Sequence, residues 1–388
     1  MTAPHTPHTL AVLGLGRMGA AFATRLVTQG WNVVGWTRSG RAPGTVRVTG
    51  DPSAAVARAD LVLMSLFDGP ACQQVLDDVH DSLRAHTIVV NTSTIAPAEA
   101  SELALRLGSS YVHAPVLGSV PAAAAGTLQI LAAADQDTLG RARPVLETLG
   151  IVQRVDDAST AAALKLIANN SLAGAVLALR DSLRQADALG LPRAQVLDVL
   201  QLGQLGALVT RKRPFLTDGS AAGTAEFTIG ALAKDMALLA AASNTPLRSA
   251  TGLADTPAAP EADITAAATV PAVEEAVLEP LRAYIRGHAT GDPAHFRDAF
   301  LPTARIEGIR EGAFVSWRLD EYCALFQGRP ASDEPTRSRR IDVTDVHGTI
   351  ATATMTLWHG ADTFTDIFLL VRVDDGWRIA NKTYHRRP

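Results

Sequence analysis

The sequence has little cysteine: only Cys72 and Cys323 occur among its 388 residues. They lie far apart, and neither has a spacing typical of metal ligands, so we expect two ordinary thiols in a reducing compartment, with no disulfide and no metal site. An excess of charge of one sign is also missing, because the formal net charge is only -4. This balance gives no electrostatic basis for binding nucleic acid or an anionic membrane, so we expect a small-molecule partner.

Targeting and membrane-spanning segments are missing as well. Residues 1–9 are short and polar and lack the basic and apolar regions of a signal peptide, and we see no apolar run long enough to cross a bilayer. We therefore expect a cytoplasmic protein. What the sequence does have is 47% hydrophobic residues in a chain longer than one core usually serves, which predicts two or three globular domains.

Short apolar runs alternate with helical segments in the first part of the chain. Helical segments such as 19–29 and 98–107 end at Gly30 and Gly108. The apolar runs are residues 10–13, 32–36, 61–66, 87–90, 111–113 and 128–132. This alternation is typical of a parallel sheet covered by helices, so we predict an α/β Rossmann domain over residues 8–157.

The middle of the chain has a different pattern. Residues 160–189 form an alanine- and leucine-rich helical stretch without proline, and helical periodicity returns at 194–200 and 229–242. We predict an all-α domain over residues 158–248. Residues 249–271 are rich in Ala, Thr, Pro and Asp and show no period, so we interpret them as an interdomain linker.

Residues 272–388 form the third predicted domain. Residues 274–288 have the pattern of an amphipathic helix, and 341–384 that of antiparallel strands. The evidence is the period-two alternation of 349–358 and an Asp375-Gly376 turn between the last two strands. This is the pattern of a separate α+β domain.

The motif Gly14-Leu15-Gly16-Arg17-Met18-Gly19 follows the first predicted strand and opens a helix. In that context Gly14 permits a tight turn, Gly16 lets the backbone approach a pyrophosphate, and Gly19 allows the helix to pack closely on the strand. Free amide groups at the helix N-terminus then bind the phosphates. A glycine-rich turn alone is weak evidence, but in this position it predicts a dinucleotide-binding loop.

The end of the second predicted strand bears on the choice of cofactor. About 20 residues after the glycine loop, NAD enzymes hold a carboxylate for the ribose hydroxyls. Here the chain carries Thr37, Arg38 and Ser39, with Arg41 close behind and no acid. Because a guanidinium binds a phosphate bidentately, we predict NADP(H) as the cofactor. The alternative is that both arginines merely belong to a solvated loop.

Five motifs in order resemble the β-hydroxyacid dehydrogenase family, which includes 3-hydroxyisobutyrate dehydrogenases and glyoxylate and succinic semialdehyde reductases. They are the glycine loop, Asn91-Thr92-Ser93-Thr94-Ile95-Ala96-Pro97, Ala114-Pro115-Val116-Leu117-Gly118-Ser119 with Gly126-Thr127-Leu128, Lys165-Leu166-Ile167-Ala168-Asn169-Asn170, and Lys234-Asp235. The resemblance covers residues 10–247. It implies an oxidoreductase acting on a CH–OH or C=O group, whose helical domain binds substrate and forms a homodimer or higher homo-oligomer.

The resemblance implies that Lys165 is the general acid or base of the reaction. A lysine on an apolar helix is desolvated, which lowers its pKa toward the working range and makes proton exchange feasible. Asn169, one helical turn later on the same face, could hydrogen-bond the substrate or orient the ammonium. The spacing alone favours a lysine that extends to solvent, and the family pattern reverses this reading.

The same resemblance implies the other ligand contacts. Substrate contacts would come from Ser93, Thr94, Gly118, Ser119, Asn169, Phe227 and Asp235. Cofactor contacts would come from Gly14, Gly16, Arg17, Met18, Gly19, Thr37, Arg38, Ser39, Leu66, Thr94 and Lys234. Ser119 replaces the second glycine of the hydroxyisobutyrate type, which favours the glyoxylate and semialdehyde reductases. For Lys234 and Asp235, an ordinary ion pair on a helix surface remains the alternative.

Two features depart from the family pattern. Asn91 stands where Asp is usual, so the local polarity differs. The helical domain of the family continues for about another helix beyond Lys234-Asp235, whereas this chain enters the predicted linker soon after Leu247. That region packs against a partner subunit in the family, so we expect an unusual oligomer.

From about Val273 onward the chain resembles the nuclear transport factor two-like superfamily of cone-shaped α+β domains, particularly its lumazine-binding group. The matching segments are Gly291-Asp292-Pro293, Phe300-Leu301-Pro302-Thr303-Ala304-Arg305, Phe364-Thr365-Asp366 and Gly376-Trp377-Arg378-Ile379-Ala380-Asn381-Lys382. Strand alternation places Asp366 on one face with aromatic residues, and His385 on one face of the next strand with Trp377. We consider both as candidates for a pocket in this domain, and a role in assembly or in capping a ligand as the alternative.

The leading hypothesis is an NADPH-dependent reductase of a small aldehyde or keto acid, or a dehydrogenase of a hydroxy acid, with Lys165 as general acid/base. An imine reductase is the first alternative, although such enzymes usually lack the lysine. The second is an NADP-binding sensor or scaffold that assembles through the C-terminal domain. Turnover of short aldehydes against cyclic imines separates the two enzymes, and tight NADPH binding without turnover of any carbonyl compound would indicate the scaffold.

Overall fold

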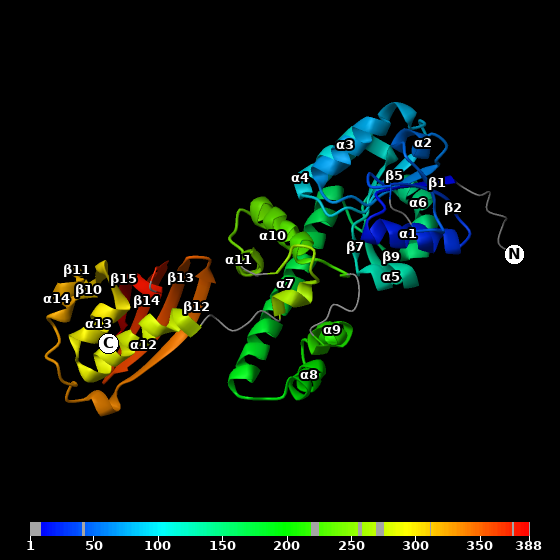
Figure 1. Cartoon of the computed structure of the whole chain (residues 1–388). Helices are drawn as coiled ribbons and strands as arrows, with labels where there is room; N and C mark the ends of the chain where they lie inside the picture. Colours follow the sequence, from blue (N-terminus) through cyan, green and yellow to red (C-terminus); the bar gives the residue numbers. More distant parts are fainter. Residues whose placement is uncertain are drawn as a thin grey trace. The chain divides into compact units, whose positions relative to one another are not determined.

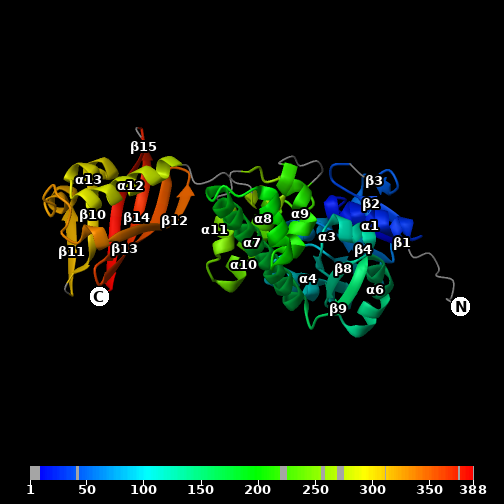
Figure 2. The same cartoon turned by 90° about the horizontal axis from the view of Figure 1, so that it is seen from below.

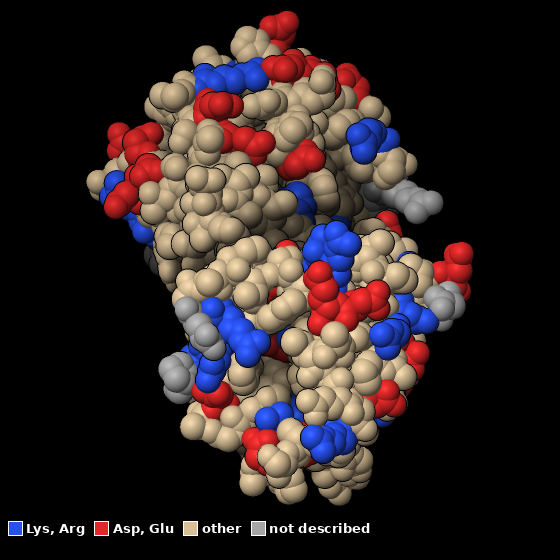
Figure 3. Space-filling view, turned by 90° about the vertical axis from the view of Figure 1, so that its left-hand side faces the viewer, with Lys and Arg blue, Asp and Glu red and all other residues tan. Residues whose placement is uncertain are grey.

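The computed structural model describes residues 9–40, 43–218, 225–254, 258–268, 275–310, 312–374 and 376–387. The chain forms two compact units, Met1–Val270 and Pro271–Pro388, and each is described by itself (Figure 1). On the face shown in Figure 3, Lys and Arg side chains are interspersed with Asp and Glu side chains. Arg41 and Asp375, which belong to the predicted cofactor loop and the last predicted turn, lie outside the described residues.

A six-stranded sheet forms the centre of the first half of unit 1. Its strands are β1 (Thr9–Leu13), β2 (Asn32–Trp36), β3 (Arg47–Thr49), β4 (Leu61–Met64), β5 (Ile88–Asn91) and β6 (Tyr111–His113). They run parallel in the order β3-β2-β1-β4-β5-β6. The direction of winding reverses between β1 and β4, so the crevice for a ligand lies at the carboxyl ends of these two strands.

Helices cover both faces of this sheet because alternate strand residues point to opposite sides. Leu10 and Val12 pack with α1 (Arg17–Thr28), α5 (Val120–Ala125) and α6 (Gln136–Leu149). Ala11 and Leu13 pack with the helices of the opposite face, α2 (Pro52–Val56), α3 (Gly69–Val79) and α4 (Pro97–Leu107). The short 3-10 turns η1 (His80–Ser82) and η2 (Gly108–Ser110) follow α3 and α4. The predicted Rossmann architecture is confirmed.

A second, three-stranded sheet follows. Its strands are β7 (Val116–Leu117), β8 (Leu128–Ala132) and β9 (Gly150–Arg154), with β7 antiparallel and β9 parallel to β8. The turn before β8 ends in Gly126, whose φ of 72° is in the left-handed region that favours glycine. Neither β7 nor β9 appears among the apolar runs, since β7 has two residues and β9 is mostly exposed or half-buried.

The second half of unit 1 is helical and is built around α7 (Ala158–Ala188) (Figure 2). The other helices are α8 (Arg193–Leu202), α9 (Gly206–Asp218), α10 (Ile229–Ser243) and α11 (Arg248–Ala254). By length and composition α7 is apolar enough to cross a membrane, so the expectation that no run qualifies was wrong. Its apolar residues pack in the described fold on α10, α11 and η3 (Ile264–Ala268), as in a core helix.

The predicted linker also differs from the structure. Residues 248–254 form α11 and residues 264–268 form η3, and Leu253, Ile264 and Ala267 are buried in the core of the helical half. Thr228 and Asp263 pair in a β-bridge that ties this stretch to the start of α10. The pattern gave no helical period because both helices are short and their small side chains pack by close approach.

Unit 2 is an α+β domain. Its strands are β10 (Phe300–Arg310), β11 (Ala313–Arg318), β12 (Ser338–His347), β13 (Ile350–His359), β14 (Asp362–Val373) and β15 (Gly376–Arg387), in the sheet order β11-β10-β15-β14-β13-β12. The helices are α12 (Glu275–Thr290), α13 (Pro293–Ala299) and α14 (Leu319–Cys323), with the turn η4 (Glu334–Thr336). In Figures 1 and 2, α12 and α13 lie on one face of the sheet, where a core rich in aromatic residues is buried.

The register of β15 corrects one predicted pocket residue. A β-bulge interrupts its pairing with β14, since Leu369 faces Asn381 and Leu370 faces Ile379. One extra residue shifts the alternation by one position, so Lys382 is buried while His385 is exposed. The prediction for His385 was therefore wrong, whereas Asp366 on β14 is buried as expected.

Candidate active site

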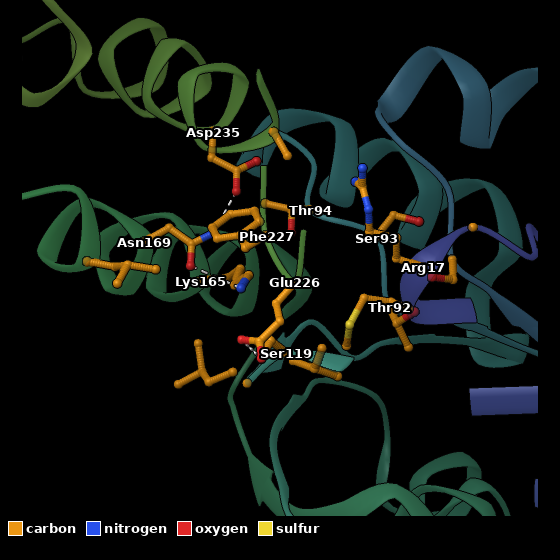
Figure 4. Close-up of a pocket in the computed structure, with 18 of the residues that line it drawn as sticks. Arg17, Thr92, Ser93, Thr94, Ser119, Lys165, Asn169, Glu226, Phe227 and Asp235 are labelled. Carbon is orange, nitrogen blue, oxygen red and sulfur yellow. Dashed lines mark hydrogen bonds between the residues drawn. The ribbon is translucent and has the colours of Figure 1, made fainter. Parts of the chain in front are cut away.

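A cavity of about 520 Å³ lies at the carboxyl edge of the six-stranded sheet, between its loops and the helices of unit 1. Figure 4 shows side chains from both halves converging on it. Most residues predicted from the sequence line this cavity: Gly16, Arg17, Met18, Leu66, Ser93, Thr94, Gly118, Ser119, Lys165, Asn169, Phe227, Lys234 and Asp235. Gly14, Gly19, Thr37, Arg38 and Ser39 are not part of its lining.

Two glycines of the dinucleotide loop have steric roles. Gly14 has a φ of 95°, and a Cβ at this position would collide with the carbonyl oxygen of Ser65 at the end of β4. A Cβ on Gly19 would collide with the carbonyl oxygen of Gly14, so α1 can approach β1 this closely only with glycine there. A Cβ on Gly16 would meet nothing within 4 Å, which leaves the backbone open on the side of the cavity.

The N-terminus of α1 is suited to an anion. Its N-cap is Gly16, and no side chain of the described residues caps the helix or places an acid in its first turn. By contrast, Asp68, Asp135 and Asp157 cap α3, α6 and α7. The amide groups at the start of α1 therefore remain available, and together with the helix dipole they fit the pyrophosphate of a dinucleotide.

The loop after β2 lies beside the glycine loop, because the amide of Gly14 donates to the carbonyl of Trp36 at 2.9 Å. Thr37 and Ser39 place their hydroxyls 3.4 Å apart, and Arg38 between them is exposed. No carboxylate occurs between Trp36 and Gly40. This loop therefore offers hydroxyls and a guanidinium to the adenosine end of a dinucleotide.

A chain of polar groups crosses the cavity from α7 to α10 (Figure 4). Lys165 Nζ donates to Asn169 Oδ1 at 3.1 Å, and Asn169 Nδ2 donates to Asp235 Oδ2 at 2.6 Å. All three side chains are buried. The ammonium requires an acceptor and the carboxylate a donor, so the two charges fix the orientation of the Asn169 amide.

Burial lowers the pKa of Lys165 to about 8, while the charge of Asp235 raises it and that of Lys234 lowers it by smaller amounts. Only 9% of the residue is exposed, so the ammonium does not extend to solvent. A pKa near 8 allows this group to exist both as an acid and as a base close to neutral pH. Lys165 therefore has the burial and the pKa of a proton donor, and it lies in the wall of the cavity.

Lys234 connects the two halves of unit 1. Its Nζ donates to the carbonyls of Phe67 at 2.9 Å and Thr94 at 2.7 Å, and it lies 2.9 Å from Asp235 Oδ1. These carbonyls belong to the loops after β4 and β5, so Lys234 ties α10 to the carboxyl edge of the sheet. Lys234 and Asp235 are thus more than an ion pair on a helix surface.

The loop after β5 is held from beneath by Asn91. This buried amide accepts from the backbone N–H of Ser93 at 2.9 Å and donates to the hydroxyl of Tyr111 at 3.2 Å. The hydroxyl of Ser93 accepts from the amide of Leu66 at 2.9 Å and also interacts with the thiol of Cys72. Asn91 therefore positions Ser93 without lining the cavity itself.

The wall of the cavity formed by α9 and the residues before α10 contains an ionic cluster that the sequence patterns do not reveal. Lys212 on α9 is 1% exposed, and its Nζ lies 2.8 Å from Asp263 Oδ2 and 3.0 Å from Glu226 Oε2. Glu226 in turn accepts from the hydroxyl of Ser119 at 3.4 Å. Arg211 and Phe67 also line the cavity and were not among the predicted residues.

Lysine content is the signal that could have identified this cluster. The chain has four lysines and 31 arginines. Lys165, Lys212 and Lys234 line this cavity, and Lys382 lines a second cavity in unit 2. Surface cations in this chain are therefore arginines, and lysine is confined to enclosed polar clusters.

Comparison with known proteins identifies relatives of unit 1. Residues 9–156 match the family described as the NAD binding domain of 6-phosphogluconate dehydrogenase. A Mycobacterium tuberculosis protein named "Probable 3-hydroxyisobutyrate dehydrogenase" is 36% identical over 201 residues, which cover 50% of this chain and 68% of that protein. The NAD-dependent L-serine dehydrogenase of Pseudomonas aeruginosa is 38% identical over 157 residues, covering 36% of this chain and 51% of that enzyme.

Solved structures agree with the sequence matches. The structure of Mycobacterium tuberculosis 3-hydroxyisobutyrate dehydrogenase with L-serine has a TM-score of 0.59 and 27% sequence identity, and the likeness covers 67% of this chain and 98% of that one. Residues 272–385 match a different family, described as "Putative lumazine-binding". The chain therefore belongs to the family of 3-hydroxyisobutyrate dehydrogenases and related β-hydroxyacid dehydrogenases, which are nicotinamide-dependent oxidoreductases, and its second unit is a nuclear transport factor two-like domain.

Proposed function

We propose that this protein interconverts a small hydroxy acid and the corresponding aldehyde or keto acid with NADP(H), and that Lys165 supplies or removes the proton. The observation that carries the proposal is the buried Lys165–Asn169–Asp235 chain in the same cavity as the glycine loop. Bound at that loop, the dinucleotide would supply or accept a hydride. The residues of this chain would transfer the proton and bind the substrate.

In the direction of reduction, Lys165 Nζ donates a proton to the carbonyl oxygen while the carbonyl carbon gains the hydride. The lysine becomes a neutral amine, which its lowered pKa permits, and it regains a proton from solvent before the next turnover. Asn169 holds Nζ in place, and Asp235 holds Asn169. Oxidation of an alcohol runs through the same groups, with the neutral amine as the base.

Recognition of a substrate carboxylate falls to the loops after β5 and β7. Ser93, Gly118 and Ser119 line the cavity on these loops, and their hydroxyl and backbone groups would contact the carboxylate. The related proteins are named for 3-hydroxyisobutyrate and L-serine, and both compounds are carboxylic acids with a primary alcohol on the β-carbon. We therefore favour a β-hydroxy acid and its semialdehyde as the substrate pair.

Glu226 would favour a substrate with an ammonium group, such as L-serine, over one without it, such as 3-hydroxyisobutyrate. Its carboxylate lies beside Ser119 and would attract an ammonium group on the substrate. In Glu226→Gln we expect KM for L-serine to rise about tenfold, because a charge-assisted contact is lost, and KM for 3-hydroxyisobutyrate to stay the same or fall. Gln keeps an acceptor for Lys212. Steady-state kinetics with both substrates test this, and equal changes in the two KM values would contradict it.

The choice of NADP(H) rests on Arg38 and on the absence of an acid in the loop after β2. In Arg38→Ala we expect kcat/KM for NADPH to fall about 10- to 100-fold, because an arginine–phosphate contact is lost, while kcat/KM for NADH changes little. Arg47→Ala, on exposed β3, is the matched control and should leave both values unchanged. The proposal fails if the unmodified protein uses NADH and NADPH with comparable efficiency.

A further inference from the structure

Unit 2 contains a cavity of its own, of about 260 Å³, enclosed by α12, α14 and the sheet. Its deep end is formed by Tyr284 on α12, Asp366 on β14 and Lys382 on β15, which are 0%, 1% and 4% exposed. Arg310 and Leu325, both exposed, lie among the residues at its open end. The reductase reaction described above uses none of these residues.

The deep end is a closed polar cluster. Lys382 Nζ donates to the hydroxyl of Tyr284 at 2.6 Å and lies 2.8 Å from Asp366 Oδ2, and the same hydroxyl donates to Asp366 Oδ2 at 2.7 Å. Asp366 is thus not an isolated carboxylate among aromatics, as strand alternation suggested. An ammonium has three protons, and these contacts use two, so one proton of Lys382 remains for a ligand.

His359 is a second polar group in the wall of the cavity. The Nε2 atom of His359 is buried and has no hydrogen-bond partner within the described part of the chain. His359 lines the cavity, with its ring 5.5 Å from that of Phe364 and 5.8 Å from that of His288. Buried polar atoms in native proteins are nearly always hydrogen-bonded, so this nitrogen is suited to bond a ligand in the cavity.

The charges of the cavity favour an anion. The titratable side chains that line it include Lys382, Arg310 and Arg386 against the single carboxylate of Asp366. Burial lowers the pKa of His359 to about 4 and holds the pKa of His288 well below its ordinary value, so both imidazoles are neutral at pH 7. Arg386 pairs with Asp362 at 2.8 Å, and Lys382 pairs with Asp366. The charge of Arg310 then leaves the lining of the cavity with an excess of positive charge.

The walls of the cavity are aromatic and suited to a flat molecule. Trp317 and Tyr384 stack with an angle of 7° between their planes and 6.2 Å between their centroids. Phe326, Phe364 and Tyr322 complete the apolar surface. Aromatic side chains offer large, rigid contact area to a planar ligand.

We propose that unit 2 binds a small aromatic carboxylate, whose ring lies between these aromatic walls, whose carboxylate meets Arg310 at the open end, and whose inner edge approaches Lys382. The volume is below the range usual for drug-sized ligands, about 300–1,000 Å³, so a ring system of one or two rings is the expected size. This site is independent of the reductase activity.

Isothermal titration calorimetry of the full chain with 2-naphthoate tests the proposal, with 2-naphthylmethanol as the neutral match. We expect one naphthoate per chain and binding of the alcohol at least about tenfold weaker, since the alcohol lacks the charge-assisted contact. Arg310→Gln should weaken naphthoate binding about tenfold. Arg305→Gln, an exposed arginine on the same strand that does not line the cavity, should leave binding within about twofold.

Two further variants complete the experiment, one at the buried end of this cavity and one in unit 1. The double change Lys382→Met with Asp366→Asn removes both buried charges together and should weaken binding while the domain stays folded, as far-ultraviolet circular dichroism reports. Lys165→Met should leave binding unchanged. Absence of saturable binding below about 1 mM, equal affinity for acid and alcohol, or an affinity that follows Lys165 rather than Arg310 would overturn the proposal.

Discussion

Replacing Lys165 with Met is expected to lower kcat for carbonyl reduction about 10²- to 10⁴-fold, the range typical of a lost general acid. Methionine fills much the same space as the lysine chain but carries no proton to donate. NADPH binding, measured by fluorescence titration, should stay unchanged because the glycine loop and Arg38 are not in contact with Lys165. The loss should therefore appear in kcat rather than in the dissociation constant of the cofactor.

Gln185→Met is the matched control for this change. Gln185 is exposed on the same helix and lies outside the cavity, so its replacement should leave kcat near the value of the unmodified protein. Near-normal turnover by Lys165→Met on a confirmed substrate would show that the proton comes from another group.

Replacing Lys212 with Met is expected to destabilise unit 1 by about 3–5 kcal/mol, because Asp263 and Glu226 would then face each other with no cation between them. Burial tends to raise the pKa of Asp263, but its hydrogen bonds with Lys212 and Thr265 hold that pKa below the ordinary value. A depressed carboxyl pKa contributes stability that is present above the unfolded value and lost as pH falls through the folded one. The difference between the two proteins should therefore shrink in acid.

Urea unfolding measures this effect, and Arg213→Met provides the comparison. Arg213 is the next residue along α9, and its partner Asp198 is 66% exposed, so losing this pair should cost only about 0–1 kcal/mol. Adding Asp263→Asn to Lys212→Met should recover part of the lost stability, since one of the two unpaired charges is removed. Equal destabilisation by the Lys212 and Arg213 changes would show that the buried ion pairs of Lys212 contribute no more to the free energy of unfolding than an exposed ion pair does.

The parts of the fold that repeat a simple pattern could be predicted from the sequence. The apolar runs of β1, β4 and β5 have the length of buried strands, and α7 has the length and apolar composition of a long core helix. Each segment therefore indicates one type of secondary structure. Lys165, Asn169 and the glycine loop stand at fixed offsets on these elements, so their positions could be inferred once the elements were known. Asp235 reaches the same cavity through α10, and only the family resemblance indicated its place.

Other features depend on contacts between distant residues and leave no local signal. Lys212 meets Asp263 51 residues away, and Asp263 lies in a segment whose composition resembles a linker. The bulge in β15 changes which side chains face the core of unit 2, and it is set by pairing with β14 rather than by the residues of β15 alone. Three-dimensional packing decides both features, whereas the scarcity of lysine was visible in the sequence from the start.

The pH dependence of turnover tests the role of Lys165 most directly. Since burial lowers the pKa of Lys165 to about 8, the ammonium form prevails below pH 8 and the neutral amine above it. The kcat/KM for aldehyde reduction should be constant below pH 8 and fall about tenfold per pH unit above it, while the kcat/KM for alcohol oxidation should rise about tenfold per pH unit below pH 8 and be constant above it. In Lys165→Met the residual rates should show neither change. A reduction rate that stays constant through pH 8 to 10, or the same inflection in Lys165→Met, would contradict the assignment of Lys165 as the proton donor.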